Sequence, residues 1–514
     1  MPQYFNQDMI FSLKNSLMSW VMRKRIHQID LFRNYPHEVQ QEWLESLLDT
    51  AKNTEWGKLY KFNEIQSYEE FRRRVPISDY NELSPFINRL RKGEENILWP
   101  SESKWFAKSS GTSGSASKYI PVTKESLYDC HFKGGKDMLT IYCDNFPETQ
   151  VFNGKSVIMG GSHEPSLSEQ KKEGDLSAII VENLPFWVNV HQTPNKEIRL
   201  MNDFEKKIDQ MAVITSQEDV TNISGVPSWM IVLFHKILEK TGADNISKVW
   251  PNLELYMHGG VKFTPYKSQF DTLIPNGANY LETYNASEGF FGIQDQKNTN
   301  DMLLMLDYGI FYEFIPTDKL SEREAIGIWD VEMGVNYALV ISTNSGLWRY
   351  LIGDTIQFTS VKPYRFIISG RINQFINAFG EELIMANAEQ AIKKACQNNN
   401  AEVNEYSAAP KFMKEGEKGA HEWVFEFIIA PESKEKFTSE LDNALKEINS
   451  DYASKRNKDM ALVMPIVHFV QKGFFYKWMK SQGKLGRQFK VPRLANHRNH
   501  IESIFNLMET MKSE

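Results

Sequence analysis

The chain has 514 residues, of which 41% are hydrophobic and 24% are charged, and its formal net charge at pH 7 is −7. This length exceeds what one hydrophobic core usually supports, and the composition is that of a soluble globular protein rather than a disordered, collagen-like or membrane protein. The negative charge argues against nucleic acid as a partner, because proteins that bind it usually carry a surplus of basic residues.

The N-terminal segment, residues 9–32, has apolar residues at helical spacing, interrupted by Lys14, Asn15 and the basic residues 23–25. It lacks the long apolar run of a signal peptide or a membrane span. We therefore expect a helix that packs on its own domain, and no membrane association.

An odd number of cysteines without C-x-x-C spacing argues against a disulfide framework or a zinc site and favours a reducing cytoplasm. The three are Cys130, Cys143 and Cys396.

Residues 109–123, SSGTSGSASKYIPVT, concentrate glycine, serine and threonine and then supply Lys118. Glycines let backbone N–H groups approach phosphate oxygens, hydroxyls donate further hydrogen bonds, and a lysine offsets the charge of the outer phosphates. The loop does not fit the P-loop of NTPases, because Ala116 and Ser117 stand where that pattern needs Gly and Lys. It indicates a polyphosphate site of another kind.

The same loop also offers Ser115 and Lys118 as an S-x-x-K pair, and residues 240–242 spell K-T-G, as in serine acyl-enzymes such as β-lactamases. Two features argue against this interpretation. No Ser-Asp-Asn occurs in the sequence, and residues 240–242 end a predicted helix where that mechanism needs a strand.

Short apolar runs at residues 156–159, 253–257 and 337–341 predict buried strands, and residues 228–240 predict a helix that Gly242 closes. Strands that alternate with helices indicate an α/β protein.

The segment YNASEGFFG, residues 284–292, predicts a tight turn that carries Tyr284 and Glu288. A carboxylate beside a bound triphosphate would hold Mg²⁺, and a tyrosine beside it could stack on a purine. Further along, residues 347–358 place Asp354 after Gly353 at the end of an aromatic-rich strand, where a carboxylate could accept both hydroxyl protons of a ribose.

Each of these segments taken alone is also typical of an ordinary turn. Together they supply a phosphate loop, a metal carboxylate, a ring for the base and a carboxylate for the ribose. That combination is what the transfer of AMP from ATP to a carboxylic acid requires.

A strand at residues 364–368 ends near Gly370, and a helical pattern at 381–396 follows. We place a domain boundary here, with an N-terminal domain at 1–370 and a C-terminal cap at 371–514. The predicted cap elements are strands at 422–429 and 466–470, a helix at 437–448 and a helical tail. The fold class expected is α/β, with a large N-terminal domain of β-sheets flanked by helices and a smaller C-terminal α/β cap.

The phosphate loop and the segments YNASEG, WRYLIGD and ISGRINQFINAFGEEL resemble the ordered motifs of the adenylate-forming superfamily. Within it, SSGTSG with SKYIPVT, YNASEGFFG and GRINQFINAFGEE resemble the auxin-responsive acyl acid amido synthetases. The resemblance extends from the phosphate loop to KVPRL at 490–494. It implies conjugation of a small carboxylic acid to an amino acid, with ATP and Mg²⁺ as cofactors.

The resemblance also implies roles for individual residues. Glu288 would hold the metal and act in catalysis together with Lys490, which would come from the cap. Residues at the acyl pocket would be His258, Gly259 and Gly260. Nucleotide contacts would come from Ser110, Gly111, Thr112, Ser113, Lys118, Tyr284 for the adenine, Ser287, Asp354 for the ribose, and Arg371 from the hinge.

Two alternatives stay open at this point. An acyl-CoA ligase would share the adenylation step and use a thiol acceptor, although Asn373 and Gln374 replace the acidic pair common in those enzymes and match the amido synthetases better. A non-catalytic nucleotide-binding protein would keep the fold without turnover, yet the charged residues Lys118, Glu288, Asp354 and Lys490 are all present.

Overall fold

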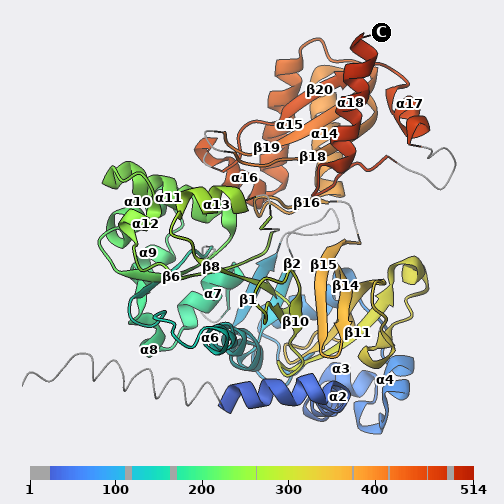
Figure 1. Ribbon diagram of the computed structural model, residues 1–514. Coiled ribbons are helices and arrows are strands. Elements are labelled where there is room, and N and C mark those ends of the chain that lie inside the picture. The colour runs from blue at the N-terminus through green and yellow to red at the C-terminus, as the bar shows by residue number, and fades with distance from the viewer. Residues whose placement is uncertain are drawn as a thin grey trace, which may run out of the picture.

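The computed structural model describes residues 24–109, 118–161, 171–261, 263–264, 266–372, 375–414, 417–459, 461–482 and 491–513. Two parts follow each other along the chain, a large body (residues 24–372) and a smaller cap (residues 375–513) that sits on one end of it (Figure 1). This is the predicted α/β architecture of a large domain with a smaller α/β cap, and the prediction is confirmed.

A sheet of twelve strands runs through the body in the order β12-β11-β13-β14-β15-β10-β9-β8-β7-β6-β3-β5. The strands from β8 to β5 pair in parallel, and those from β8 to β12 pair antiparallel. The parallel strands are β3 Lys155–Ile158, β5 Gln192–Thr193, β6 Val220–Ser224, β7 Leu255–Gly259 and β8 Asn279–Ala286. The others are β9 Gly289–Ile293, β10 Met302–Leu304, β11 Ile310–Pro316, β12 Ile326–Gly327, β13 Asn336–Thr343, β14 Tyr350–Val361 and β15 Tyr364–Arg371.

Helices join the parallel strands, as βαβ connections require. Helix α11 (Pro227–Thr241) shows how the sequence sets its ends: Pro227 occupies the first turn, where no backbone donor is needed, and Gly242 ends it in the left-handed conformation at φ 69°. The other helices of the body after the phosphate loop are α6 Lys133–Asn145, α7 Leu176–Asn183, α8 Phe186–Asn189, α9 Lys196–Arg199, α10 Phe204–Thr215, α12 Ile246–Val249 and α13 Lys267–Leu273.

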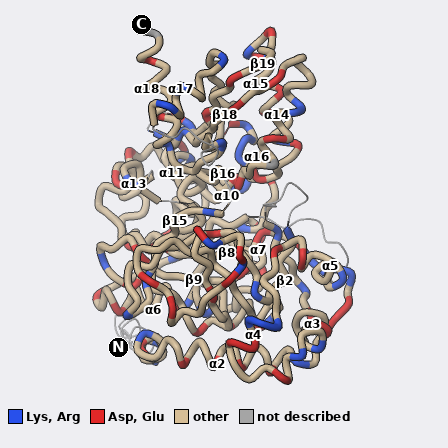
Figure 2. Tube along the Cα trace, turned by 90° about the vertical axis from the view of Figure 1, so that its right-hand side faces the viewer, with Lys and Arg blue, Asp and Glu red and all other residues tan. Residues whose placement is uncertain are grey.

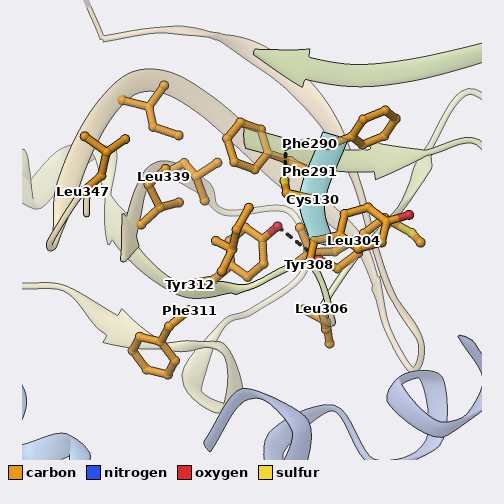
Figure 3. Packing of buried hydrophobic residues seen from close by; sticks show 14 of the residues in the cluster. Cys130, Phe290, Phe291, Leu304, Leu306, Tyr308, Phe311, Tyr312, Leu339 and Leu347 are labelled. Carbon is orange, nitrogen blue, oxygen red and sulfur yellow. Dashed lines mark hydrogen bonds between the residues drawn. The ribbon is translucent and has the colours of Figure 1, made fainter. Parts of the chain in front are cut away.

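The N-terminal helices cover the antiparallel strands at the base of the body (Figure 1). Gln40, fully buried on α2 (Pro36–Ala51), satisfies backbone groups of Leu306, Ile310 and Tyr312 and so fixes this helix to the start of β11. Beneath it lies the main core, in which Cys130 packs under Phe290 and Phe291 (Figure 3). Three shorter helices follow α2, namely α3 Glu55–Leu59, α4 Tyr68–Arg74 and α5 Tyr80–Arg91.

A second, three-stranded sheet, in the order β2-β1-β4, carries the predicted phosphate loop. Strand β1 (Trp105–Ser109) and strand β2 (Lys118–Val122) pair antiparallel, so that Ser109 lies opposite Lys118. The two strands therefore bring both ends of residues 110–117 together. Strand β4 (Lys172–Gly174) pairs in parallel with β1.

The cap contains the three-stranded sheet β18-β19-β20 and the hairpin β16-β17. Its predicted strands and helices are all present, but the first helix begins at Met385 rather than at residue 381, because Leu383 and Ile384 form a strand with Phe375 and Ile376. The strands are β16 Phe375–Ile376, β17 Leu383–Ile384, β18 Glu402–Lys411, β19 Ala420–Ile429 and β20 Ile466–Val470. The helices are α14 Met385–Asn399, α15 Lys434–Ile448, α16 Ser450–Arg456, α17 Phe474–Ser481 and α18 Asn499–Ser513.

The cap and the parallel half of the body share one hydrophobic cluster, in which Phe379 of the cap is fully buried. Polar contacts join the same surfaces: the Tyr266 hydroxyl donates to the carbonyl of Ala378, and the Ser228 hydroxyl donates to that of Phe379. Acidic and basic residues are intermixed along the chain in both parts (Figure 2). Among the residues that the structure describes, none of the helices is long and apolar enough to cross a membrane. The boundary at 370 stays a prediction.

One buried ion pair fixes the turn that leads into β14. The Arg349 guanidinium bonds to the Glu313 carboxylate at 2.7 Å and to the carbonyls of Arg72 and Val75, and the two charged side chains are 5% and 0% exposed. A buried carboxylate that loses such a partner keeps its desolvation cost without compensation.

We expect Arg349→Met to lower the free energy of unfolding by about 3–5 kcal/mol, since it leaves Glu313 charged and buried. Urea denaturation followed by fluorescence measures this. The control is Arg323→Met, which removes an exposed ion pair with Glu82 and should cost about 1 kcal/mol or less. Equal losses of unfolding free energy in Arg349→Met and Arg323→Met would contradict the assignment of Arg349 and Glu313 as a buried, stabilising ion pair.

Candidate active site

The Asp354 carboxylate lies at the centre of a buried polar cluster. One of its oxygens accepts a hydrogen bond from the Tyr284 hydroxyl, and the other accepts from Nε of Arg371, which stands opposite it across β14 and β15. Arg371 also lies 3.6 Å from the Glu382 carboxylate of the cap and 4.9 Å from the centre of the Phe375 ring. Three residues that the sequence predicted from separate motifs thus meet in one place.

This meeting depends on the curvature of the large sheet. Strands β8 and β14, which carry Tyr284 and Asp354, are four places apart in the strand order. In a flat sheet they would be about 19 Å apart at the usual spacing of neighbouring strands. Their direct hydrogen bond shows that the sheet coils through β9, β10 and β15.

Asp354 lies inside β14 and not at the end of a strand, as the sequence had suggested. Residues 347–349, with Trp348 among them, belong to the turn between β13 and β14, and the strand begins only at Tyr350. Gly353, with φ 101°, then turns the backbone in a way that a residue with a side chain rarely adopts. This local irregularity carries the carboxylate toward Tyr284.

Glu288 and Lys118 form a second charged group beside the first. Glu288 lies in the two-residue turn between β8 and β9, as predicted, and burial raises its pKa although Lys118 acts against this. Burial lowers the pKa of Lys118, whose ammonium lies 3.4 Å from the Tyr350 hydroxyl, while Glu288 and Asp354 favour its charged form. Ser287, in the same turn, is half-buried.

The turn with Glu288 rests on a π-helix, residues Ser126–Phe132. His131 of this element contacts the side-chain oxygen of Asn285 at 3.0 Å, and the Cys130 sulfur accepts from the backbone N–H of Phe290 at 3.1 Å (Figure 3). Burial lowers the pKa of His131 to about 4, so the ring is neutral near pH 7. Single π-turns inside helices are frequent near functional sites, and this one fixes the hairpin that carries Glu288.

His258, Gly259 and Gly260 end β7 one strand away from Tyr284. The His258 ring stacks on Phe263 at 4.1 Å and is neutral near pH 7, because burial lowers its pKa to about 3. Any side chain at Gly259 would collide with the Thr283 carbonyl, and the Gly260 carbonyl accepts from Asn377 of the cap. A contact of these residues with an acyl acid stays a prediction.

Several predicted residues lie outside those that the structure describes, and their roles stay predictions. They are Ser110, Gly111, Thr112, Ser113 and Lys490, together with Asn373 and Gln374.

Glu382, Tyr350 and Asn285 belong to the site although the sequence analysis did not single them out. Glu382 follows Glu381 in one predicted motif, and Tyr350 precedes Asp354 in another. Inspection of every polar residue in those motifs would have found both. The contact of Asn285 with His131 joins residues 154 positions apart and has no local signal.

A metal ion could be held at Glu288 only with help from other ligands. No group of three or more histidine, cysteine, aspartate or glutamate side chains could hold a metal within the described part of the chain. Mg²⁺ is commonly bound by one or two carboxylates and the phosphates of a substrate, and a single carboxylate beside Lys118 fits that mode.

Comparisons with known proteins agree with this geometry. Models of the GH3 family match the N-terminal domain at residues 25–278, the central domain at 303–371 and the C-terminal domain at 386–499. An indole-3-acetic acid-amido synthetase of Arabidopsis thaliana is 22% identical over 92% of both chains. A jasmonoyl–L-amino acid synthetase of Nicotiana attenuata is 23% identical over 92% of this chain and 94% of its own.

Solved structures share the fold. A GH3.15 acyl acid amido synthetase in complex with 2,4-DB has a TM-score of 0.59 at 17% identity and covers 98% of this chain and 97% of its own. A 2-hydroxyisobutyryl-CoA ligase in complex with 2-HIB-AMP and CoA has a TM-score of 0.54 at 12% identity, with 92% of each chain covered.

The raised pKa of Glu288 gives a testable dependence of stability on pH. Because this pKa lies higher in the folded chain than in the unfolded one, the folded state loses stability as pH rises through the unfolded value of 4.5. Below that pH the Glu288 carboxyl is protonated in both the folded and the unfolded state, and this loss of stability is absent.

We therefore expect Glu288→Gln to raise the melting temperature of the ligand-free protein at pH 7 and to leave it unchanged at pH 4. Differential scanning calorimetry at both pH values measures this. The exposed Glu324→Gln serves as the control and should have no effect at either pH. A lower melting temperature of Glu288→Gln at pH 7 would contradict the assignment.

Proposed function

The chain belongs to the GH3 family, and we propose that it is an ATP-dependent acyl acid amido synthetase. It activates a small carboxylic acid as the acyl-adenylate, with release of pyrophosphate, and transfers the acyl group to the amine of an amino acid. The observation that carries this proposal is the cluster of Asp354, Arg371, Glu288 and Lys118, because it combines a ribose acceptor with charged groups for phosphates in one buried place.

The Asp354 carboxylate has hydrogen-bond acceptor sites left for a ribose. An ionised carboxylate offers about four lone-pair sites, and Tyr284 and Arg371 use two of them. Two acceptor sites thus stay available for the two ribose hydroxyls. Tyr284 also offers a ring edge for the adenine, although its ring packs on Phe291 at 4.8 Å.

The phosphates would lie between the loop 110–113 and the charged residues. Arg371 supports this placement, because its Nη1 is buried without a hydrogen-bond partner among the described residues, as expected of a donor that a ligand oxygen completes. Mg²⁺, when bound at Glu288, would neutralise charge on the phosphate oxygens. Ser287 stands next to Glu288 in the turn between β8 and β9.

Two half-reactions follow from this arrangement. An oxygen of the acid's carboxylate attacks the α-phosphorus of ATP, and the bond to pyrophosphate breaks, with Lys118 and the loop residues Ser110, Gly111, Thr112 and Ser113 stabilising the charge that develops. The acceptor amine then attacks the acyl carbon, and AMP leaves with the electrons of the broken C–O bond.

The cap takes part in the first step in this proposal. Lys490, outside the described residues, would supply positive charge between the acid and the α-phosphate, and the cap would then turn about the segment after Gly370. Glu382 of the cap already contacts Arg371 of the body. The acid would lie near His258, Gly259 and Gly260, at the end of β7.

The place of action proposed is the cytoplasm. Its support is the state of Cys130, Cys143 and Cys396, which are all free thiols at separate buried or half-buried positions, as a reducing compartment allows.

The test of the function uses the purified chain with ATP, Mg²⁺, and panels of carboxylic acids and the twenty amino acids. We expect acid-dependent exchange of labelled pyrophosphate into ATP, and an acyl–amino acid amide by mass spectrometry. Formation of ADP and phosphate alone would reject the adenylation step. With coenzyme A added in competition, accumulation of acyl-CoA and no amide would select an acyl-CoA ligase.

The role of Asp354 is tested by Asp354→Ala. Loss of a charged acceptor of ribose hydroxyls should cost about 1.5–3 kcal/mol per hydrogen bond, hence at least about tenfold in ATP affinity by isothermal titration calorimetry. Asp318→Ala, at an exposed position of the body, is the control and should bind ATP normally. Normal ATP affinity of Asp354→Ala would remove ribose recognition from Asp354.

A further inference from the structure

Two charged side chains on α16 have no hydrogen bond or ion pair with any residue that the structure describes. Lys455 is only 6% exposed, and its ammonium lies 4.0 Å from the centre of the Trp229 ring on α11. Asp451, one helical turn earlier, is half-buried. The two do not pair with each other, although their spacing on the helix would permit an ion pair.

The place that they face is a switch point of the parallel sheet. The chain runs from β3 to β5 on one side and then to β6 on the other, and ligands of such sheets bind outside the carboxyl ends of the strands where the order reverses. Trp229 lies in the first turn of α11, the helix that follows β6, and Gly161 comes shortly after β3. The Asp175 carboxylate packs against Gly161 so closely that no side chain would fit there.

Helix α16 covers this switch point from the cap side. It lies at the base of the cap, on the side where the cap meets the body (Figure 1). The Lys455–Trp229 contact and an ion pair between Lys458 and Glu205 join the same elements. Lys455 therefore faces the body, and the half-buried Asp451 lies one turn away on the same helix.

The same charges are close to the adenylation site. Glu382, which contacts Arg371, favours the charged form of Lys455, and Lys108, just before the phosphate loop, favours the charged form of Asp451. Burial nonetheless raises the pKa of Asp451 to about 7 and lowers the pKa of Lys455. Lys455 and Asp451 also favour each other's charged form, but burial outweighs these contributions in both, and a ligand of matching charge would offset the desolvation cost that remains.

An α-amino acid has the matching charges. It is a zwitterion whose carboxylate and ammonium are separated by one carbon, whereas a lysine and an aspartate one turn apart on a helix have their Cβ atoms about 6 Å apart and present opposite charges side by side. The ring face of Trp229 and the Asp175 carboxylate lie beside Lys455 and Asp451, and Glu381 and Glu382 also favour the charged form of Lys455.

We propose that this place is the binding site of the acceptor amino acid. Lys455 binds the α-carboxylate, and Asp451 with Asp175 binds the ammonium. One of these two carboxylates takes a proton from the ammonium, and the amine so formed faces the acyl-adenylate beyond Glu382. The proposal rests on the proposed function and adds to it the residues that select an amino acid over other amines.

The experiment compares an amino acid with its own carboxamide, which keeps the amine and lacks the charged carboxylate. The pair used is the amino acid that gives the most amide in the twenty-member panel and the α-carboxamide of that amino acid. The variants are Lys455→Met, which keeps the packing on Trp229, and Asp451→Asn. The control is Lys458→Met, which removes a neighbouring lysine of the same cap surface that pairs with Glu205.

We expect Lys455→Met to raise KM for the amino acid at least about tenfold, the scale of one charge-assisted hydrogen bond, and to leave KM for the carboxamide within twofold. Asp451→Asn should raise KM for both, because both carry an ammonium. Lys458→Met should change neither. Lys455→Arg, which restores the charge, should recover part of the lost affinity.

Pyrophosphate exchange and trapping of the acyl group by hydroxylamine are measured alongside. Neither uses the amino acid, so Lys455→Met and Asp451→Asn should keep both within twofold. Equal effects of Lys455→Met on the amino acid and the carboxamide, no effect on either, or a loss of pyrophosphate exchange would overturn the proposal in favour of a structural contact. A wild-type protein that adenylates an acid but forms no amide would reject the function itself, and the acceptor site with it.

Discussion

The hydrogen bonds that the Asp354 carboxylate accepts from Tyr284 and Arg371 are the constraint on which the site depends. They connect the last parallel strand, β8, to the antiparallel strands β14 and β15, and they require the sheet to coil until strands four places apart are in contact. The carboxylate is thereby fixed from two sides, while its other lone pairs face the site. A group that is already oriented by the fold needs little rearrangement when a ligand arrives.

This preorganisation has a cost that the rest of the body offsets. Glu288 and Lys118 are buried with their pKa values shifted toward the neutral forms, so each opposes folding in the absence of a ligand. The hairpin with Glu288 is supported by the π-helix through Cys130 and by the large aromatic core around Phe290 (Figure 3). A broad hydrophobic core under a small charged site is a common way to keep buried charged groups in place, although each of them opposes folding.

The sequence predicted most of the fold and the members of the site, because periodicity, turn residues and motif order are local signals. It placed β20, α11 and the turn with Glu288 correctly. It placed Asp354 at the end of a strand because an aromatic run before Gly-Asp looks like a strand, whereas residues 347–349 form a turn in which Arg349 bonds to Glu313. It did not predict Lys455 or Asp451. These two residues stand out only because they form no hydrogen bond or ion pair with a described residue once the fold has brought α16 against Trp229.

The turn after β16 suggests how the two half-reactions proposed above could be kept apart. The Glu381 carboxylate accepts from the backbone N–H groups of Ala378 and Phe379 and lies 2.7 Å from the fully buried His421, so the turn after β16 is fixed to the cap. Rotation of the cap, as proposed above, would carry this turn with it and would break the contacts to the body at Tyr266 and Trp229. Because α16 makes the Trp229 contact and also carries Lys455 and Asp451, the proposed acceptor site would be assembled only in the arrangement seen here. An amino acid bound there would hold the cap in this position, since it would bridge α16 and Asp175 of the body. Adenylation with Lys490 at the nucleotide would need another orientation, and the amine would then be absent from the site.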